Sequence, residues 1–354
     1  MNNSLYYKDR LSAAITWLRF PLIFLIIMLH SYSVERLAGD HETYFKILYP
    51  FSLWLGETGV PGFFFISGYL FFLSKKSYGQ KLKDRIYTLL IPYLLWNFLL
   101  LLVYLIAYAL GYPQVIFKTS IADYNWIDYI RAFWDRGEFD SGNSSPLLCP
   151  LWYIRNLLIM SVLSPILYYL IKYVREVFLI VVVIWWMLTN NNAFTPQTIL
   201  FFSLGGYFSI LNANPLNMVI EKHKLFMTLT FVFAFADILV HVGSSTPFNL
   251  MIHRTSLIFN IPALLLLADW MNKHGYTRAT AFLSQAAFIV FCIHYPIVLI
   301  IRKISLTIFT DVSEAIHISL YFVCVILTTI LSIGFYGILN SYLPKIRTIL
   351  SGNR

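Results

Sequence analysis

The chain has 354 residues, of which 58% are hydrophobic and only 12% are charged. So much apolar surface does not fit inside one water-soluble core of ordinary size, so the bilayer has to act as part of the solvent. The net charge of +9 then favours basic groups that face lipid headgroups or an anionic ligand, and we expect no nucleic-acid partner. The odd number of cysteines, three, predicts neither a disulfide framework nor a metal site.

Ten apolar stretches separated by polar breaks predict ten transmembrane helices, and their residues do not alternate as those of a barrel would. They cover residues 12–33, 52–74, 86–110, 150–171, 176–190, 196–212, 223–242, 255–272, 281–302 and 315–340. We therefore expect an all-α, polytopic membrane protein with a single transmembrane domain over residues 1–354. The stretches 176–190 and 196–212 are short, and a re-entrant pair would give the same pattern.

Lysine and arginine gather in alternate loops, at residues 8–10, 75–85, 172–175, 222–224, 273–278 and 345–354. Because short cytoplasmic loops carry an excess of these residues, we expect both termini to be cytoplasmic. The first stretch is too long for a signal peptide and no convincing cleavage site follows it, so we interpret it as a retained helix.

The long hydrophilic segment 111–149 is expected outside the cytoplasm, and it combines carboxylates with aromatic rings. These residues are Asp123, Asp128, Asp135, Glu138 and Asp140, with Tyr124, Trp126, Tyr129, Phe133 and Trp134. Such a mixture suits a carbohydrate, through hydrogen bonds to hydroxyls and ring stacking. An amphipathic helix at the membrane interface would have the same composition, so both interpretations stay open.

Arg19 and His30 are the two ionisable residues of the first predicted helix, eleven residues apart. Eleven residues fall about 20° from three full turns, so both side chains share one face and lie roughly 16 Å apart along the axis. Ionisable groups in a membrane helix usually face a cavity, which predicts a polar pathway. His30 suits a general base, and Arg19 suits an anion or a developing oxyanion. The alternative is that Arg19 reaches the headgroups and His30 sits at the outer interface.

The second predicted helix begins near Glu57, a secondary candidate for the site, and contains the run FFFISG at residues 63–68. Ser67 and Gly68 allow another helix or a thin ligand to approach the backbone closely. The basic loop that follows includes Lys83 and Arg85 and either anchors the membrane topology or binds a phosphate-bearing cofactor.

Three polar residues lie in later predicted helices. Arg155 follows Leu151 by four residues and either reaches outward or contributes to a site. His294 lies two residues before Pro296, so it either fills a hydrogen-bonding gap at a kink or takes part in chemistry. Asp237 is expected to pair with His241 on the same helical face, in a structural role.

Five motifs, in order along the chain, resemble those of the acyltransferase-3 membrane proteins, which O-acylate bacterial surface glycans. They are Arg19-x10-His30, FFFISG at 63–68, the basic loop leading to Ile91-Pro92-Tyr93, the run LWYIRN at 151–156, and FCIHYP at 291–296. The basic pair departs from the family pattern, because Lys83 and Arg85 stand in place of two arginines.

The resemblance implies a cytoplasmic acyl-CoA donor, most often acetyl-CoA, and a glycan or lipid-linked sugar acceptor on the outer side of a bacterial inner membrane. It also implies that His30 is catalytic with Arg19 as its partner, and that Lys83 and Arg85, with Ser67 and Arg155 nearby, contact the donor. A pantetheine arm reaching past Arg19 and Ser67 toward His30 would bring the thioester to the outer leaflet. Succinyl transfer, an acyl-histidine intermediate and a homo-oligomer stay open.

Two other classes of function fit a polytopic protein with ionisable residues in its helices. A transporter or flippase of a charged glycolipid would carry such residues too, although the chain has no duplicated halves. A scaffolding subunit of a glycan-assembly complex would tolerate their loss. Only an acyltransferase consumes a thioester, so acyl-CoA turnover separates the three.

Overall fold

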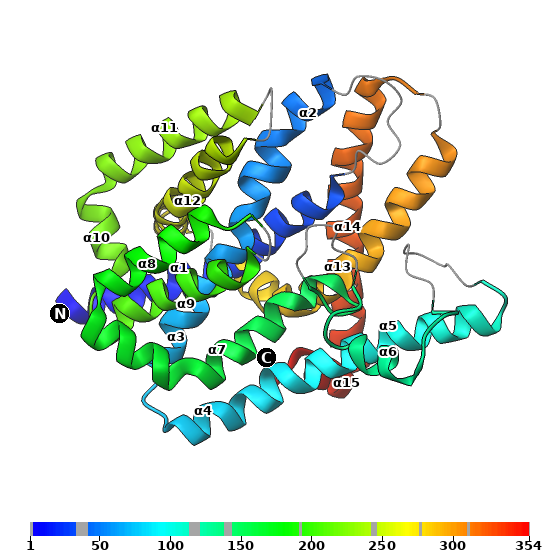
Figure 1. Ribbon diagram of the computed structural model, residues 1–354, viewed down its shortest axis with the longest axis horizontal. Helices are drawn as coiled ribbons and strands as arrows, with labels where there is room; N and C mark the ends of the chain where they lie inside the picture. Colours follow the sequence, from blue (N-terminus) through cyan, green and yellow to red (C-terminus); the bar gives the residue numbers. More distant parts are fainter. Residues whose placement is uncertain are drawn as a thin grey trace.

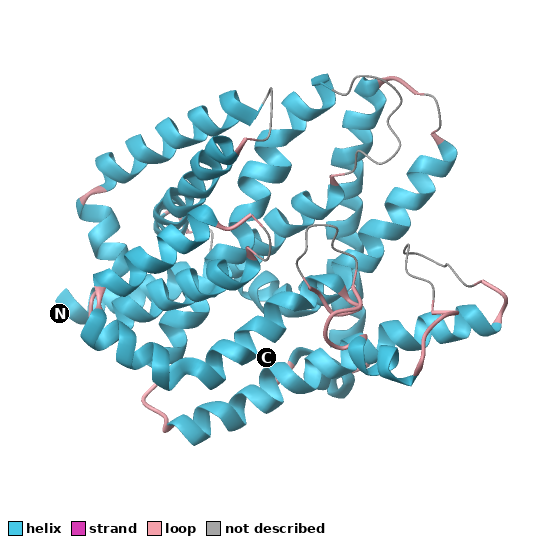
Figure 2. Ribbon diagram, in the orientation of Figure 1, coloured by secondary structure: helices cyan, strands magenta, loops and turns pink. Residues whose placement is uncertain are grey.

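The computed structural model describes residues 3–32, 42–112, 121–137, 144–190, 193–241, 246–275, 278–309 and 312–353. All regular secondary structure in these ranges is helical, with short loops between helices (Figure 2). The expected all-α class is therefore confirmed.

Seven helical segments are long and apolar enough to cross a membrane. Five of them are built on single α-helices: α1 (Asn3–Ser31), α11 (His223–His241), α12 (Pro247–Lys273), α13 (Arg278–Ile308) and α14 (Glu314–Tyr342). The other two are composite, α4 (Tyr78–Arg85) with η3 (Ile86–Leu90) and α5 (Ile91–Ala109), and η4 (Cys149–Leu151) with α7 (Trp152–Tyr169) and η5 (Leu170–Val174). The chain is thus a multi-pass membrane protein.

The remaining three predicted spans form shorter helices. The second is a column of α2 (Glu42–Tyr49), η1 (Pro50–Leu55), η2 (Gly56–Thr58) and α3 (Gly59–Leu73), with irregular turns in its middle. The fifth is α8 (Glu176–Leu188), with 13 residues. The sixth is α9 (Phe194–Ile210), which bends by 91° into α10 (Pro215–Glu221). Seven crossing helices, or eight if that bent pair is one span, are shown in the described ranges, and the number ten and the side of the termini stay predictions.

Most of the long helices lean in the same direction, with the N-terminus at one end of the bundle (Figure 1). α1 lies inside this bundle and packs against α3, α12, α13 and α14. Two short helices, α6 (Trp126–Arg131) and α15 (Pro344–Ser351), lie beside α5. The sharing of α1 among so many neighbours explains why Ile23, Ile26 and Ile27 are almost completely buried.

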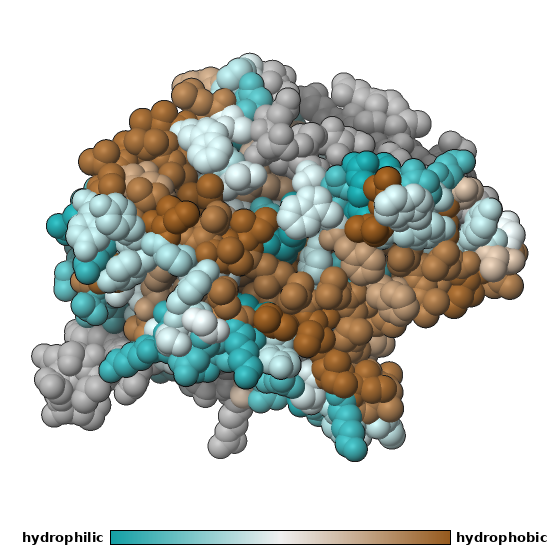
Figure 3. Space-filling model, turned by 60° about the horizontal axis from the view of Figure 1, so that its bottom comes forward, coloured by the Kyte–Doolittle hydropathy of each residue, from teal (hydrophilic) through white to brown (hydrophobic). Residues whose placement is uncertain are grey.

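Apolar side chains cover much of the outer surface, as a membrane protein requires. Figure 3 shows hydrophobic residues spread across the middle of one face, with hydrophilic residues gathered toward its edges. On α5 alone Leu94, Phe98, Leu102, Val103 and Ile106 are exposed. In water this surface would be a large aggregation site, whereas lipid chains cover it at no cost.

The tightest helix pair is α3 with α9, and glycine makes it possible. A Cβ atom on Gly68 would come within 1.9 Å of the Phe202 carbonyl oxygen, and one on Gly205 within 2.0 Å of the Phe65 carbonyl oxygen. The two backbones therefore touch, in the manner of small-residue packing between membrane helices. This contact holds the residues of the FFFISG run in place beside α1.

Candidate functional site

A cavity of about 410 Å³ lies between α1, α3, α4, η3, α7 and α13. Its polar lining consists of Arg19, Ser67, Arg85, Tyr153, Ser284 and Gln285, and the other lining residues are apolar. Three of the predicted site residues, Arg19, Ser67 and Arg85, are thus brought together from three separate helices. The volume and the mixed lining suit a slender ligand that carries anionic groups.

Arg19 lies on a polar stripe of α1 that leads into the cavity. Ser12, Thr16 and Arg19 follow one another at helical spacing and are all exposed, whereas the flanking Leu11, Ile15 and Leu18 are buried. Arg19 and Ile23, one turn further along α1, both line the cavity. The predicted polar pathway from Arg19 to His30 stays a prediction, because the residues between them, Ile23, Ile26 and Ile27, are apolar and buried.

Ser67 is held by a tyrosine from the opposite wall of the cavity. Its Oγ lies 3.0 Å from the hydroxyl of Tyr153 on α7, and the same hydroxyl lies 3.5 Å from the Phe63 carbonyl oxygen. Tyr153 belongs to the LWYIRN run, so the structure joins two motifs that are distant in sequence. The two hydroxyls together offer a hydrogen-bonding point halfway along the wall.

The basic residues of α4 divide between two faces of this helix. Ser77 and Gln80 form a capping box that starts α4. The Lys81 ammonium and the Arg85 guanidinium then both lie over the Phe71 ring, 5.0 and 5.3 Å from its centroid. Lys83 is exposed and lines no part of the cavity. Arg85 therefore lines the cavity, whereas Lys81 and Lys83 do not, and Lys81 shares with Arg85 only the contact with Phe71. The predicted donor contact of Lys83 stays a prediction.

A second, almost wholly apolar hollow of about 880 Å³ runs along the outside of α5 and α7. Arg85 lines this groove as well as the cavity, and Trp134, Arg131 and Arg155 line its other end. The groove faces the lipid-exposed side of these helices, so lipid chains would fill it.

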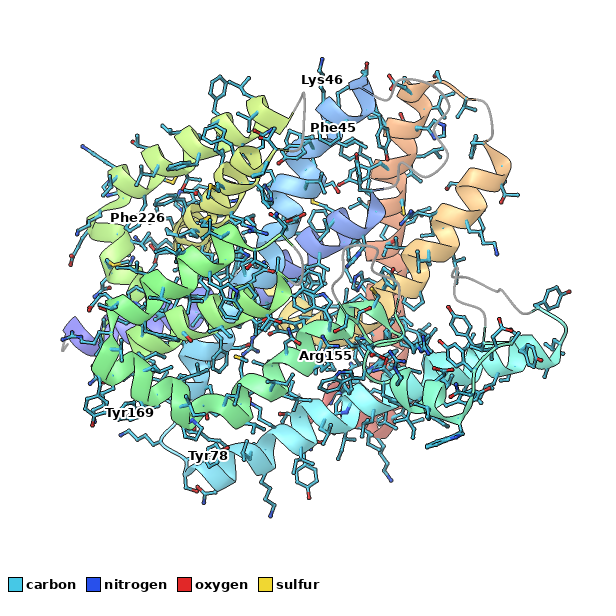
Figure 4. All side chains as sticks on the ribbon, viewed as in Figure 1. Phe45, Lys46, Tyr78, Arg155, Tyr169 and Phe226 are labelled. Carbon is cyan, nitrogen blue, oxygen red and sulfur yellow. The ribbon has the colours of Figure 1, made fainter. Side chains whose placement is uncertain are left out.

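Arg155, which is labelled in Figure 4, lies near the start of α7 and does not line the cavity. Its Nη2 donates to the Ser144 carbonyl oxygen at 2.9 Å, and its Nη1 donates to that of Trp134 at 2.5 Å. Asn97 on α5 accepts from the Leu148 amide at 3.1 Å. These bonds tie Trp134, Ser144 and Leu148 to the bundle. The expected contact of Arg155 with the donor stays a prediction.

His30 lies at the C-terminal end of α1 and does not line the cavity. Its ring centroid is 4.9 Å from that of Tyr295 and 5.5 Å from that of His294, both on α13. Because His294 also lies 5.9 Å from the cavity-lining Phe291, the histidines continue the path beyond the cavity. The sequence-based prediction gave His294 only as a secondary candidate, because the sequence of α1 does not show that α13 packs beside it.

The end of α1 is fixed by three neighbouring elements. The last carbonyls of a helix lack intrahelical donors. Here Ser52 of η1 and Tyr321 of α14 each donate to the Met28 carbonyl oxygen at 3.1 Å, and Arg302 of α13 donates to that of His30 at 3.4 Å. The backbone that carries His30 is therefore held from several sides, as a catalytic group requires.

Glu57, the other secondary candidate, belongs to a separate network whose other members, His253 and Asp237, are buried. Its Oε2 lies 3.0 Å from Nε2 of His253, whose Nδ1 lies 2.8 Å from Oδ2 of Asp237. Tyr49 donates to the other oxygen of Asp237 at 2.9 Å. Asp237 thus pairs with His253 on the next helix. The side chain of His241, its predicted partner, lies outside the described residues.

Residues 121–137, in the hydrophilic segment that is expected outside the cytoplasm, fold into a compact turn around α6. Asn125 and Asp128 form a capping box, and Arg136 bonds the Asp128 carboxylate. This bond lowers the pKa of Asp128 below its ordinary value. A lowered carboxyl pKa means that the contact is intact at neutral pH and is lost only as the pH falls through the acid range. Glu138 and Asp140 of the expected sugar-binding surface lie outside the described residues.

Comparisons with known proteins identify the family of the chain. Residues 12–337 match the family described as "Acyltransferase domain". The chain is 24% identical over 319 residues to the Succinoglycan biosynthesis protein ExoH of Rhizobium meliloti (strain 1021), an alignment that covers 85% of this chain and 82% of that protein. No solved structure gives a significant match. Because the match extends over nearly its whole length, the chain belongs to the acyltransferase-3 family and is a membrane acyltransferase.

Proposed function

We propose that this acyltransferase moves an acyl group, acetyl by first choice, from cytoplasmic acyl-CoA to a hydroxyl of a glycan or lipid-linked sugar beyond a bacterial inner membrane. The relative named above is a succinoglycan biosynthesis protein, which supports a polysaccharide acceptor. The thioester is made inside the cell, and the CoA phosphates cannot enter hydrocarbon cheaply. The protein therefore has to lead the acyl end of the donor through a protected channel.

The order of groups from α4 along α1 is the observation that carries this proposal. Arg85 of α4 and Arg19 of α1 line the cavity, Lys81 lies beside Arg85 over Phe71, and His30 lies about 16 Å beyond Arg19 along α1. Cations therefore stand where the phosphates would arrive, and an imidazole stands at the far end. The cavity lined by Arg19, Ser67 and Arg85 would hold the pantetheine arm, and His30 lies beyond this lining.

The positions suggest how the chemistry is divided. His30 removes the proton from the acceptor hydroxyl, whose oxygen attacks the thioester carbonyl and expels the CoA thiolate. Arg19 lies too far down α1 to touch the same atoms, so its charge serves to hold the donor in the cavity. An acyl-histidine intermediate on His30 would need the same placement.

The test compares wild type with His30→Ala in native membranes supplied with radiolabelled acetyl-CoA. Loss of the base should lower the rate of label transfer by about a hundredfold or more. His223→Ala is the matched control, because His223 is exposed at the start of α11, and it should transfer label at the wild-type rate.

The same variants can complement a deletion strain of the source organism, in which alkali-labile acyl groups on surface glycans are measured. Wild type should restore these esters and His30→Ala should not. Equal transfer by both proteins would remove His30 from the mechanism, and a wild type that neither consumes the thioester nor restores esters would favour the flippase or the scaffold.

A further inference from the structure

The side chain of His294 is fully buried, and one of its nitrogens has a defined role. Nδ1 lies 2.6 Å from the carbonyl oxygen of Phe291, three residues earlier in α13. A carbonyl oxygen only accepts, so Nδ1 must carry a proton and donate it. The tautomer of the neutral ring is thereby fixed, and Nε2 carries the lone pair.

Nε2 of His294 has no hydrogen-bond partner among the described residues. Buried polar atoms nearly always have one, and an exception at a functional place usually marks where a substrate, water or proton belongs. The hydrogen bond made by His294 does not compensate for the missing N–H of Pro296. The carbonyl that Pro296 leaves without a donor is that of Cys292, whereas His294 bonds the carbonyl of Phe291.

The surroundings of His294 connect the cavity with His30. Its ring lies 5.9 Å from that of Phe291, which lines the cavity, and 5.5 Å from that of His30. A proton can pass between two imidazoles at such a separation directly or through one water. Two adjacent imidazolium ions repel each other, so the pair holds one additional proton at a time.

We propose that His294 is the partner of His30 in holding the transferred proton, with Nε2 as its proton-accepting atom; this rests on the acyl transfer proposed above. The acceptor O–H bond breaks as the new ester C–O bond forms, and its proton goes to the His30–His294 pair. The C–S bond of the thioester then breaks, and the pair returns the proton to the thiolate. The products are the acyl ester and free CoA thiol, and both imidazoles are neutral again.

The matched variants separate proton transfer from structure. In His294→Asn the side-chain amide can still donate to the Phe291 carbonyl but carries no base. In His294→Gln a polar atom stands near the place of Nε2, again without a base. If His294 only secures α13, Asn should act like wild type. If Nε2 holds the proton, both variants should turn over more slowly than wild type.

We expect His294→Asn and His294→Gln to lower kcat at least tenfold, with the KM for acetyl-CoA within twofold of wild type. CoA thiol release is followed in native membranes, and thermal unfolding in detergent confirms that the variants fold. Adding His294→Asn to His30→Ala should cause little further loss, since groups that act as a unit are not additive.

Wild-type turnover by His294→Asn, or a full additional loss in the double variant, would overturn this inference and leave the acyl transfer standing. A wild type that releases no CoA thiol would overturn both.

Discussion

At the scale of single residues, the basic loop shows how helical geometry assigns partners. Residues 81 and 85 are four apart and share a face of α4, whereas residue 83 is rotated by about 200° from residue 85. Both cations of the shared face lie over Phe71, and of the two Arg85 lines the cavity. The sequence-based prediction chose Lys83 from its motif position and stays a prediction, whereas the structure shows that Lys81 shares the contact with Phe71.

Substitution of these basic residues shows whether the donor is bound by individual side chains or only by the net charge of the loop. Arg85→Ala and Lys81→Ala should each raise the KM for acyl-CoA about 10- to 100-fold, because a charge-assisted hydrogen bond to phosphate contributes roughly 1.5–3 kcal/mol. Lys83→Ala removes the same charge from the same loop and should change KM less than twofold. The measurement is CoA thiol release against acyl-CoA concentration. An equal rise in all three variants would show that net loop charge, and not the cavity, binds the donor.

Arg155 illustrates what a local sequence cannot reveal. An arginine at the start of an apolar helix predicts either an outward-reaching side chain or a site residue. In the structure the carbonyls of Trp134 and Ser144, 21 and 11 residues earlier, accept its bonds. These partners lie in the loop before α7, and the path of a loop cannot be predicted from helical periodicity.

At the scale of elements, hydropathy predicted where the helices lie but not where they are irregular. The predicted span 52–74 is the column of η1, η2 and α3, with Gly56 and Gly59 pressed against α1. An average over apolar residues does not distinguish this column from a straight helix. The predicted stretch 196–212 corresponds to α9, and the 91° bend that leads from α9 into α10 was not predicted.

The contact between α3 and α9 predicts a strong effect of a single methyl group. Gly68→Ala should lower the free energy of unfolding by about 1–3 kcal/mol or more, because the new Cβ overlaps the backbone of Phe202 and the helices must separate. Gly334→Ala in α14 is the control, since nothing lies within 4 Å of its Cβ position. It should change stability by no more than about 1 kcal/mol. Thermal unfolding in detergent provides the comparison, and similar melting of both variants would contradict the close approach.

At the scale of the whole molecule, the Glu57–His253–Asp237 network joins the column before α3 to α11 and α12. The sequence analysis predicted His241 as the partner of Asp237 because residues four apart on one helix share a face. In the structure Asp237 pairs with His253, sixteen residues away, because α11 and α12 are neighbours. The predicted pair with His241 stays a prediction, since the side chain of His241 lies outside the described residues. Long-range pairs of this kind, like His30 with His294, are the part of the site that sequence periodicity leaves open.

Removal of His253 should therefore destabilise the protein as a whole. Asp237 is completely buried, and His253→Ala leaves its carboxylate without this partner, at a cost of about 3–5 kcal/mol. His223→Ala, at an exposed position, should have little effect. The midpoint of thermal unfolding in detergent measures both. Equal midpoints would mean that the network contributes no net stability.

Arg85 has one further consequence, because it belongs to the cavity wall and to the wall of the lipid-facing groove. On the α3 side the cavity is bounded by helices whose backbones touch and cannot yield. On the Arg85 side, one side chain lines both the cavity and the lipid-facing groove. Because the proposed donor in the cavity and lipid chains in the groove would share this side chain, we expect the KM for acyl-CoA to change with the lipid composition of the bilayer in which it is measured.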